Sequence, residues 1–386
     1  MIIAGYEYRS EKPFRNVYLT GLVRDQKRRK MSKSLGNSPE PIELIEKYGA
    51  DGVRVGMLLC SPAGNDLLYD DSLPEQGRNF ANKIWNAFRL IKSWEVDDKI
   101  DQPDSSKVAV KWMGEVLKKS IHDIDINFRK FRISEALMIT YKLFWDEFSS
   151  WYLEIIKPAY QKPVDRETLN ATIAILDKLL KLIHPFMPFI TEELWQMLLE
   201  RKNGESIMVA LMPEAKKFDK ELIADFDSIK ETVSAVRTVR KNKSMNGKEK
   251  LELLIRTEKD SYDVDLLPVI IKLCNLSHIS FVTDKQSGAA SFMVKTTEYF
   301  IPVGDNLDVE NELAKLREEL DYNRGFLESV MKKVDNHRFV QNAPPSVLDL
   351  ERKKKSDAEM KIKSLEERIE QLKNQPPKSR RAGLNT

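Results

Sequence analysis

Five consecutive residues, Lys-Met-Ser-Lys-Ser at positions 30–34, carry the clearest candidate chemistry in the sequence. Two ammonium groups three positions apart, with hydroxyls at Ser32 and Ser34, can surround a triphosphate with positive charge and hydrogen-bond donors. Gly36 follows and leaves the backbone free to turn. Because the segment comes after the apolar residues Val17–Leu19 and a polar run, we expect a mobile loop that leaves a buried strand. The alternative is a solvated basic loop, the usual state of a charge run.

The five residues resemble the KMSKS signature of class I aminoacyl-tRNA synthetases. In that family the loop closes over ATP, which is used with Mg²⁺, and stabilises the pyrophosphate charge while the amino acid attacks the α-phosphate. The resemblance implies that Lys30 and Lys33 hold the phosphates during catalysis, with the larger electrostatic share at Lys33. It also implies that the whole loop contributes to ATP binding, through Lys30, Met31, Ser32, Lys33 and Ser34.

The second signature of that family is His-x-Gly-His, which donates hydrogen bonds to ATP, and the sequence does not contain it. The histidines stand far apart, at His122, His184, His278 and His337. His184 lies in His-Pro-Phe-Met-Pro-Phe, where we expect a helix end rather than a catalytic role. The opening residues Met1–Gly5 are typical of a domain interior. We therefore expect a C-terminal portion of a larger enzyme that is inactive by itself.

Length and composition predict two to four compact units, since 386 residues with 41% hydrophobic content can build sizeable cores. The charges nearly balance, with 63 Lys and Arg against 60 Asp and Glu, so RNA contacts must come from local patches. Cys60 and Cys274 lie far apart in apolar surroundings and predict neither a zinc site nor a disulfide. Without a signal peptide or a long apolar run, we expect a cytoplasmic protein that does not contact membranes.

We expect a mainly α-helical chain with five regions. They are the end of a Rossmann-type catalytic domain (1–71), a helical anticodon-binding bundle (72–204), a small α+β module (205–305), an antiparallel coiled-coil hairpin (306–374) and a disordered basic tail (375–386). In the first region Pro41–Gly49 predicts a short helix, with Pro near its start and Gly past its end. Asp51 and Arg54 are expected to pair and pack rather than to catalyse.

Apolar side chains recur at steps of three and four residues through the second region, which predicts a buried helical stripe. They are Ile133, Leu137, Tyr141, Phe144, Phe148, Trp151 and Ile155. At the start of this region, Asn82, Asn86 and Arg89 share a polar face opposite an apolar one. Such groups can recognise unstacked bases of single-stranded RNA, although a solvated face has the same spacing.

The run from Gly77 to Arg89 resembles the start of the anticodon-binding bundle in the valyl-tRNA synthetase family. That resemblance implies contacts to the tRNA anticodon from one helix, through Arg78, Asn82, Lys83, Asn86 and Arg89.

The third region mixes two periods, as a small α+β module does. We expect helices at Glu231–Val239 and Leu266–Leu273, and strands at Leu251–Ile255, Ile279–Val282 and Phe300–Val303. A basic cluster at residues 237–243 is either an RNA-backbone contact or, as we favour, a solvated helix end.

A heptad pattern marks the fourth region, with apolar seam positions and one polar position at Asn323 that sets the register. The seam residues are Val309, Leu313, Leu316, Leu320, Leu327, Val330 and Val334. A second stripe, Ala358, Ile362, Leu365, Ile369 and Leu372, follows a short Pro-containing break and a possible helix cap at Ser346. The pattern predicts an antiparallel hairpin with arms of about 40 Å.

This hairpin resembles the arm with which members of the valyl-tRNA synthetase family lean on the outer corner of tRNA. The isoleucine-specific family commonly ends in cysteine-rich zinc modules, which two distant cysteines cannot form. Candidate contacts to the phosphates of the tRNA elbow are Arg324, Lys332, Lys333, Arg338, Lys353 and Lys354. Alternatively, these charges only keep the arm soluble.

The resemblance implies the C-terminal part of an enzyme that joins valine to tRNA(Val) through a valyl-adenylate, using ATP. We expect a monomer, because the two seams lie in one chain and pair with each other. An isoleucine-specific enzyme and a non-catalytic RNA-binding or coiled-coil assembly protein are the alternatives.

Overall fold

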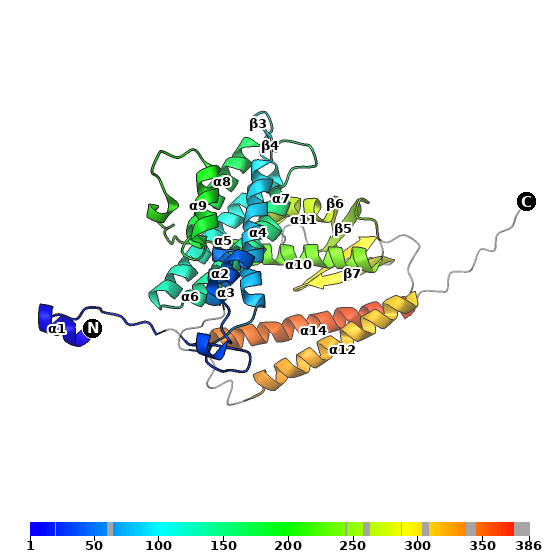
Figure 1. Cartoon of the computed structure of the whole chain (residues 1–386). Coiled ribbons are helices and arrows are strands. Elements are labelled where there is room, and N and C mark those ends of the chain that lie inside the picture. Colours follow the sequence, from blue (N-terminus) through cyan, green and yellow to red (C-terminus); the bar gives the residue numbers. More distant parts are fainter. Residues whose placement is uncertain are drawn as a thin grey trace, which may run out of the picture. The chain divides into compact units, whose positions relative to one another are not determined.

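The computed structural model describes residues 1–19, 21–59, 65–243, 245–257, 263–286, 288–302, 309–336 and 345–373. Cys60, Arg338 and the tail at 375–386 lie outside these ranges. The chain divides into two compact units, Met1–Phe226 and Asp227–Thr386. Helices dominate the first unit, and the second combines a small sheet with two long helices (Figure 1). The mainly helical fold predicted from the sequence is confirmed.

The first segment of the chain is extended and exposed. Helix α1 (Ile2–Arg9) buries none of its residues, so the interior environment expected for Met1–Gly5 is not present in the described structure. Val17 and Leu19 are 66% and 76% exposed, and the buried strand expected there is wrong. The strand is instead β1 (Val23–Arg24), which pairs in parallel with β2 (Leu67–Leu68). A strand forms where its backbone finds a hydrogen-bonding partner, and β2 offers one beside β1.

One close helix crossing fixes the next elements. Helix α2 (Pro41–Tyr48) ends before Gly49, as predicted, and the apolar stretch after it forms α3 (Ala50–Leu59). A Cβ at Gly77 of α4 (Ser72–Lys92) would lie 2.0 Å from the Gly52 carbonyl oxygen of α3. Because only glycine permits this approach, α3 and α4 pack backbone to backbone.

The helical bundle of the first unit contains α4, α5 (Asp104–Arg129), α6 (Ile133–Lys142), α7 (Leu153–Ile156), α8 (Arg166–Ile183) and α9 (Pro188–Leu198). A π-helical segment, η2 (Leu143–Tyr152), joins α6 to α7. Four residues of the predicted stripe, Leu137, Phe144, Phe148 and Ile155, are fully buried, and the other three, Ile133, Tyr141 and Trp151, are half-buried. The wide turn in η2 was not predicted, because the apolar spacing remains close to three and four residues through it.

Short elements complete the first unit. Strands β3 (Val96–Asp97) and β4 (Val164–Asp165) pair in parallel and join the loop after α4 to the start of α8. The 3₁₀ turn η3 (Ile207–Val209) follows α9. Helix α10 (Lys220–Asn242) begins in this unit, where Phe226 stacks on Trp112 at 4.0 Å between ring centroids.

The second unit contains the sheet and helix expected for the α+β module, whose predicted range of 205–305 begins in the first unit. Its sheet has the strand order β6-β5-β8-β7, formed by β5 (Leu251–Arg256), β6 (Leu276–Val282), β7 (Ala289–Val294) and β8 (Thr297–Pro302). The turn η5 (Val264–Leu266) and helix α11 (Leu267–Cys274) connect the parallel strands β5 and β6. Strand β7 was not predicted, because its first three residues are Ala-Ala-Ser and carry little strand preference.

One member of the basic cluster at residues 237–243 is structural. The Arg240 guanidinium donates to the carbonyl oxygens of Asn246, Glu249, Cys274 and Asn275 at 2.8–3.2 Å. The expectation of a solvated helix end is therefore wrong for Arg240, which ties α10 to the loop before β5 and to the end of α11. The adjacent Cys274 thiol is buried, which raises its pKa to about 12.

Helices α12 (Val309–Val334) and α14 (Pro345–Lys373) form an antiparallel hairpin (Figure 1). Its seam buries Leu320 against Leu365 and Ile369. Cross-helix ion pairs join Lys361 to Glu319 and Lys333 to Glu351, so higher numbers on one helix meet lower numbers on the other. The antiparallel prediction is confirmed, and helices of 26 and 29 residues reach about 40 Å.

The predicted polar seam position, Asn323, is 6% exposed. Its side-chain amide donates to the Glu319 carbonyl oxygen at 2.7 Å, one turn earlier on the same helix. Helix α14 begins at Pro345, one residue before the predicted cap Ser346. Proline suits the first turn of a helix because that turn has N–H groups without intrahelical partners.

Candidate functional site

The signature loop begins at a tight turn after β1. The Arg28 amide donates to the Asp25 carbonyl oxygen at 2.8 Å, and Arg28 takes a left-handed φ of 62°. The chain then returns, so that Lys30 bridges Arg24 in antiparallel fashion and the Met31 amide donates to the Val23 carbonyl oxygen at 3.1 Å. Residues 30–34 therefore start from a backbone anchored to β1.

A single 3₁₀ turn, η1 (Lys33–Leu35), forms the far side of the loop. It ends at Gly36, whose φ of 63° is a conformation that favours glycine. The Ser32 and Ser34 hydroxyl oxygens lie 3.2 Å apart. The turn predicted at Gly36 is confirmed, and it reverses the chain directly after the signature.

Both signature lysines are exposed. The Lys33 side chain is 85% exposed, and its ammonium lies 3.6 Å from Glu40, a carboxylate that is itself 50% exposed. Such an exposed ion pair contributes little and exchanges readily for another anion. The Lys30 side chain is exposed as well. The two ammonium groups are thus accessible to a phosphate ligand.

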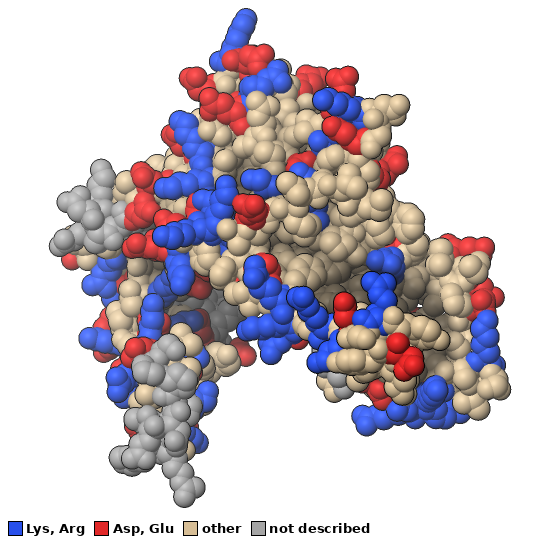
Figure 2. Space-filling model, turned by 90° about the vertical axis from the view of Figure 1, so that its left-hand side faces the viewer, with Lys and Arg blue, Asp and Glu red and all other residues tan. Residues whose placement is uncertain are grey.

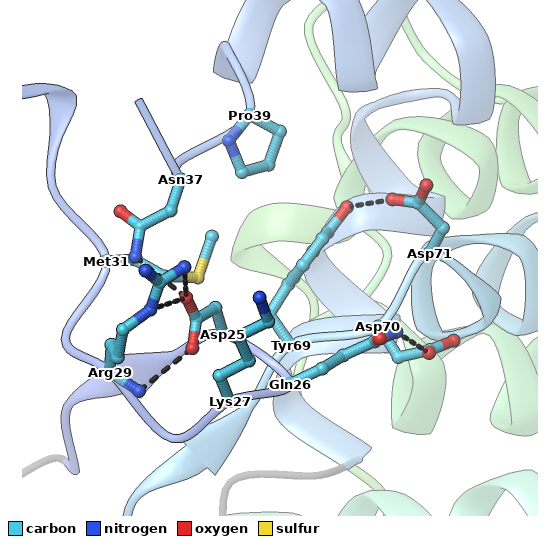
Figure 3. A pocket seen from close by; sticks show the side chains of 10 residues that line it. All are labelled: Asp25, Gln26, Lys27, Arg29, Met31, Asn37, Pro39, Tyr69, Asp70 and Asp71. Carbon is cyan, nitrogen blue, oxygen red and sulfur yellow. Dashed lines mark hydrogen bonds and ion pairs between the residues drawn. The ribbon is translucent and has the colours of Figure 1, made fainter. Parts of the chain in front are cut away.

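The loop backbone, in contrast, is held by two side chains, Asp25 and Asn37. The Asn37 amide oxygen accepts from the Ser32 amide at 3.0 Å, and its nitrogen donates to Asp25 at 3.0 Å and to the Lys30 carbonyl oxygen at 3.2 Å. Asp25 also accepts from the Arg29 backbone amide and guanidinium, both at 2.8 Å. We call this Asp25–Asn37 pair the clasp. Figure 3 shows Asp25, Asn37 and Arg29 pointing toward one another.

These hydrogen bonds stabilise the charged form of Asp25. They lower the pKa of its carboxyl from 3.8 to about 2, with the Asn37 hydrogen bond as the largest cause and the Arg29 contacts next. The clasp is therefore a fully ionised carboxylate bonded to an amide near neutral pH.

A cavity of about 400 Å³ opens beside the loop (Figure 3). It is lined by Asp25, Gln26, Lys27, Arg29, Met31, Asn37, Pro39, Tyr69, Asp70 and Asp71. Gln26 donates to Asp70 and the Tyr69 hydroxyl donates to Asp71, both at 2.8 Å. Burial, followed by the Asp71 hydrogen bond, raises the pKa of Tyr69. The carboxylates leave this wall without a net positive charge, so the charge suited to phosphate lies on the loop itself.

Asp51 and Arg54 join α3 to the turn between α8 and α9. Asp51 is 7% exposed and accepts from the Ile190 and Phe189 amides, at 2.7 and 3.3 Å, at the start of α9. Arg54 donates to the Phe186 and Pro185 carbonyl oxygens, both at 3.2 Å. The packing role is confirmed, but the expected pairing between the two side chains is wrong. Instead, Asp51 accepts from backbone amides and Arg54 donates to backbone carbonyl oxygens.

His184, the residue directly after α8, belongs to the same turn. Its Nδ1 atom lies 2.7 Å from the Thr191 hydroxyl, and burial lowers its pKa. The expectation of a helix-end residue holds, and the side chain contributes to the packing of α8 against α9.

The predicted anticodon residues on α4 fall into two groups. Asn82, Asn86 and Arg89 are exposed, on the face opposite the buried Phe80, Ile84 and Phe88.

Arg78 and Lys83 are engaged with the protein. The Arg78 guanidinium donates to the Lys47 carbonyl oxygen at 3.5 Å and lies 5.6 Å from the Tyr48 ring centroid. The Lys83 ammonium lies 5.3 Å from the Trp145 ring centroid. The structure therefore presents two amides and one guanidinium, rather than five free groups.

Most of the candidate cations on the hairpin have carboxylate partners. Arg324 pairs with Glu366 at 2.6 Å and Lys332 with Glu328 at 2.8 Å, and all four side chains are about half or more exposed.

Lys333 and Lys354 both hold Glu351, a carboxylate that is 7% exposed, at 3.8 and 2.6 Å. Lys353 is exposed. On the face drawn in Figure 2, Lys and Arg lie interspersed with Asp and Glu.

Three family models match separate parts of the chain. A model for class I tRNA synthetases (I, L, M and V) matches residues 1–70, a model for the anticodon-binding domain of tRNA ligases matches 110–255, and a model for the valyl-tRNA synthetase tRNA-binding arm matches 308–373. Among curated proteins, the valine–tRNA ligase of Parabacteroides distasonis is 58% identical over 96% of this chain. The chain belongs to the valine–tRNA ligase family.

More distant members of the valine–tRNA ligase family also match. The Phocaeicola vulgatus relative is 56% identical over 97% of the chain, and the Bacillus cereus relative is 35% identical over 96%. The chain spans 42% of the length of the first two relatives and 44% of the third. The choice of the valine family over the isoleucine family is confirmed.

The matched ranges include some of the predicted site residues and not others. The signature loop lies in the region that matches the class I model, and the hairpin lies in the region that matches the arm model. Arg78–Arg89 lies between the class I and anticodon-binding matches, so these contacts stay predictions.

Sequence reasoning missed Asp25 and Asn37. Asp25 has a local signal, since aspartate favours the first position of a turn. Asn37 has none, because its role depends on how the chain reverses at Gly36.

Two further searches concern metals and membranes. In the described ranges, no group of three or more His, Cys, Asp and Glu side chains converges as a metal site would require. The described helices include none that is long and apolar enough to span a membrane.

Proposed function

We propose that this chain supplies the loop that closes over ATP and the tRNA-binding surfaces of an enzyme that joins valine to tRNA(Val) through a valyl-adenylate. The observation that carries the proposal is the loop at residues 30–34, where two accessible lysine side chains extend from an anchored backbone. This arrangement suits a triphosphate ligand, because the charges can move onto the phosphates while their attachment points stay fixed.

Lys30 and Lys33 hold the phosphates of ATP and neutralise the charge that develops on pyrophosphate as it leaves. The hydroxyls of Ser32 and Ser34 donate hydrogen bonds to phosphate oxygens, and Met31 completes the ATP-binding loop. Mg²⁺ supplies further neutralisation of the triphosphate when bound. Lys33 has the larger role because its only described partner, Glu40, is exposed and easily replaced.

Anticodon recognition belongs to the exposed face of α4, where Asn82, Asn86 and Arg89 reach the edges of unstacked bases. Arg78 and Lys83 support this face through Lys47 and Trp145, since their cationic groups already contact the protein.

The hairpin contacts the tRNA elbow through phosphates. Arg324 and Lys332 exchange exposed carboxylates for phosphate at little cost, and Lys353 is available directly. Lys333 joins the two helices of the arm through Glu351, which Lys354 also binds, and both lysines add positive potential nearby. Arg338, outside the described residues, is a further elbow contact. The protein is a monomer, because each seam finds its partner in the same chain.

A chimera tests the proposal. Residues 1–386 replace the matching part of the Parabacteroides distasonis relative, and exchange of pyrophosphate into ATP is measured with valine. We expect valine-dependent exchange by the chimera and none by the 386-residue chain alone, whose sequence lacks His-x-Gly-His. A folded chimera that binds tRNA without any exchange would favour a non-catalytic RNA-binding role instead.

A further inference from the structure

The clasp binds two positions of the signature, Lys30 and Ser32, through the Asn37 side chain. The Asn37 amide binds the Lys30 carbonyl oxygen and the Ser32 amide, so it fixes the backbone on both sides of Met31. Its third hydrogen bond goes to Asp25, whose side chain is only 15% exposed. A carboxylate can only accept, so Asp25 orients the Asn37 amide with its nitrogen toward the carboxylate and its oxygen toward Ser32.

Asp25 also binds Arg29, the residue before the signature. It binds both the backbone amide and the guanidinium of Arg29. The main chain is therefore bonded to the clasp at positions 29, 30 and 32, while the side chains of Lys30 and Lys33 are exposed. A fixed backbone with exposed lysine side chains limits the range of positions through which each ammonium must move to reach its phosphate.

We propose that Asp25 and Asn37 are positioning residues for the activation step: they hold the backbone of residues 29–32 so that Lys30 and Lys33 reach the phosphates together. This inference rests on the proposed function, since it acts through those two lysines. The clasp residues act through the two lysines. Their effect on the rate is transmitted through the backbone of the loop.

Substitutions in the chimera separate positioning from simple structural support. Asn37→Asp places a second carboxylate where the Asn37 nitrogen now lies 3.0 Å from Asp25, so the clasp becomes repulsive. We expect kcat for pyrophosphate exchange to fall by about ten- to a hundredfold at pH 8, the scale of a misplacement near 1 Å. The KM for valine should stay unchanged. The deficit should shrink toward pH 6, because two adjacent carboxylates take up a proton more readily than one.

The exchanged pair, Asp25→Asn with Asn37→Asp, tests the contact itself. An amide at position 25 can donate to a carboxylate at 37 while still accepting from the Arg29 backbone amide. The exchange loses the bond from the Arg29 guanidinium and the bond to the Lys30 carbonyl oxygen, so the recovery is partial. The carboxylate at 37 can still accept from the Ser32 amide. We expect the double variant to recover about tenfold over Asn37→Asp, as one regained charge-assisted hydrogen bond would give. Its pH dependence should return to that of the unmodified chimera.

Gln26→Ala is the matched control. Gln26 lies on the same cavity wall and donates to Asp70, and none of the hydrogen bonds described for it reaches residues 30–34. It should leave kcat unchanged. Hydrogen exchange of the Ser32 amide in the 386-residue chain adds a physical readout, and Asn37→Asp should accelerate it.

The outcomes are distinct. A native kcat for Asn37→Asp at every pH would overturn the inference, as would a double variant no faster than the single one. If Lys33→Ala, measured in parallel, also leaves the rate unchanged, the proposed function fails as well. If Lys33→Ala slows exchange while the clasp variants do not, only the clasp inference fails.

Discussion

Removing the Asp51 carboxylate should destabilise the first unit by about 2 kcal/mol, because the amides of Ile190 and Phe189 lose their acceptor at the start of α9. A buried donor left without a partner costs about 1–3 kcal/mol, and the loss of a helix-capping acceptor costs about 0.5–2 kcal/mol. These two costs describe the same hydrogen bonds and overlap. Part of the lost free energy of unfolding is recovered, because alanine avoids the burial of charge that raises the pKa of Asp51.

Asp51→Asn is the matched variant. It keeps one acceptor oxygen and carries no charge, so we expect a smaller loss of about 1 kcal/mol. The difference in free energy of unfolding between the native chain and the variant should depend on pH, because burial raises the pKa of the Asp51 carboxyl above 3.8 in the folded state. The stability that protonation contributes is fully present below pH 3.8 and is lost as the pH rises through the raised pKa. The cost of Asp51→Asn should therefore be largest below pH 3.8 and smaller above it.

Urea unfolding followed by tryptophan fluorescence is the assay. All six tryptophans precede residue 226, so the signal reports the first unit alone. An Asp51→Ala chain as stable as the native one would refute the capping role. A cost of Asp51→Asn that grows with rising pH would refute the assigned direction of the pKa.

Three further predictions concern packing, the clasp and the arm. Gly77→Ala should lower the stability of the first unit by about 1–3 kcal/mol, because a Cβ would meet the Gly52 carbonyl oxygen at 2.0 Å. Gly114→Ala, with nothing within 4 Å of the new atom, should raise stability by about 0.4–1 kcal/mol in the same assay, and equal effects at both sites would contradict the close crossing. Nuclear magnetic resonance should find that the Asp25 carboxyl titrates near pH 2 and that Asn37→Ala moves its pKa toward 3.8; a titration that does not move would show that Asn37 does not hold it. Removal of residues 309–386 should weaken tRNA binding and reduce its salt dependence while anticodon preference persists, whereas lost preference with unchanged affinity would reverse the roles given to α4 and the arm.

The arm and the bundle core were predictable because regular helices repeat their environment. A heptad at Leu313, Leu320 and Leu327 repeats the same contact every two turns, so spacing alone indicates the seam. The stripe through Leu137, Phe144 and Phe148 is periodic for the same reason.

Other features depend on contacts between segments distant in the sequence. The backbone amides that donate to Asp51 and the carbonyl oxygens that accept from Arg54 lie more than 130 positions away, in the turn between α8 and α9. No local pattern distinguishes such contacts from a direct pair. Arg240 is similar, because a charged helix end has the same sequence whether its guanidinium meets water or four carbonyl oxygens.

The signature loop falls between these cases. Its lysines are recognisable by type and spacing, and their exposure agrees with the proposed role. The clasp is not recognisable, because Asn37 reaches Ser32 and Lys30 only after the left-handed turn at Gly36.

The most direct test of the account is the rate of valine-dependent pyrophosphate exchange by the chimera carrying Lys33→Ala. The substitution removes one charge-assisted phosphate contact, worth about 1.5–3 kcal/mol, so the rate should fall by about ten- to a hundredfold. Its exposed partner Glu40 contributes little to stability, and the fold should be unaffected. An unchanged exchange rate in the folded variant would contradict the assignment of residues 30–34 to ATP chemistry.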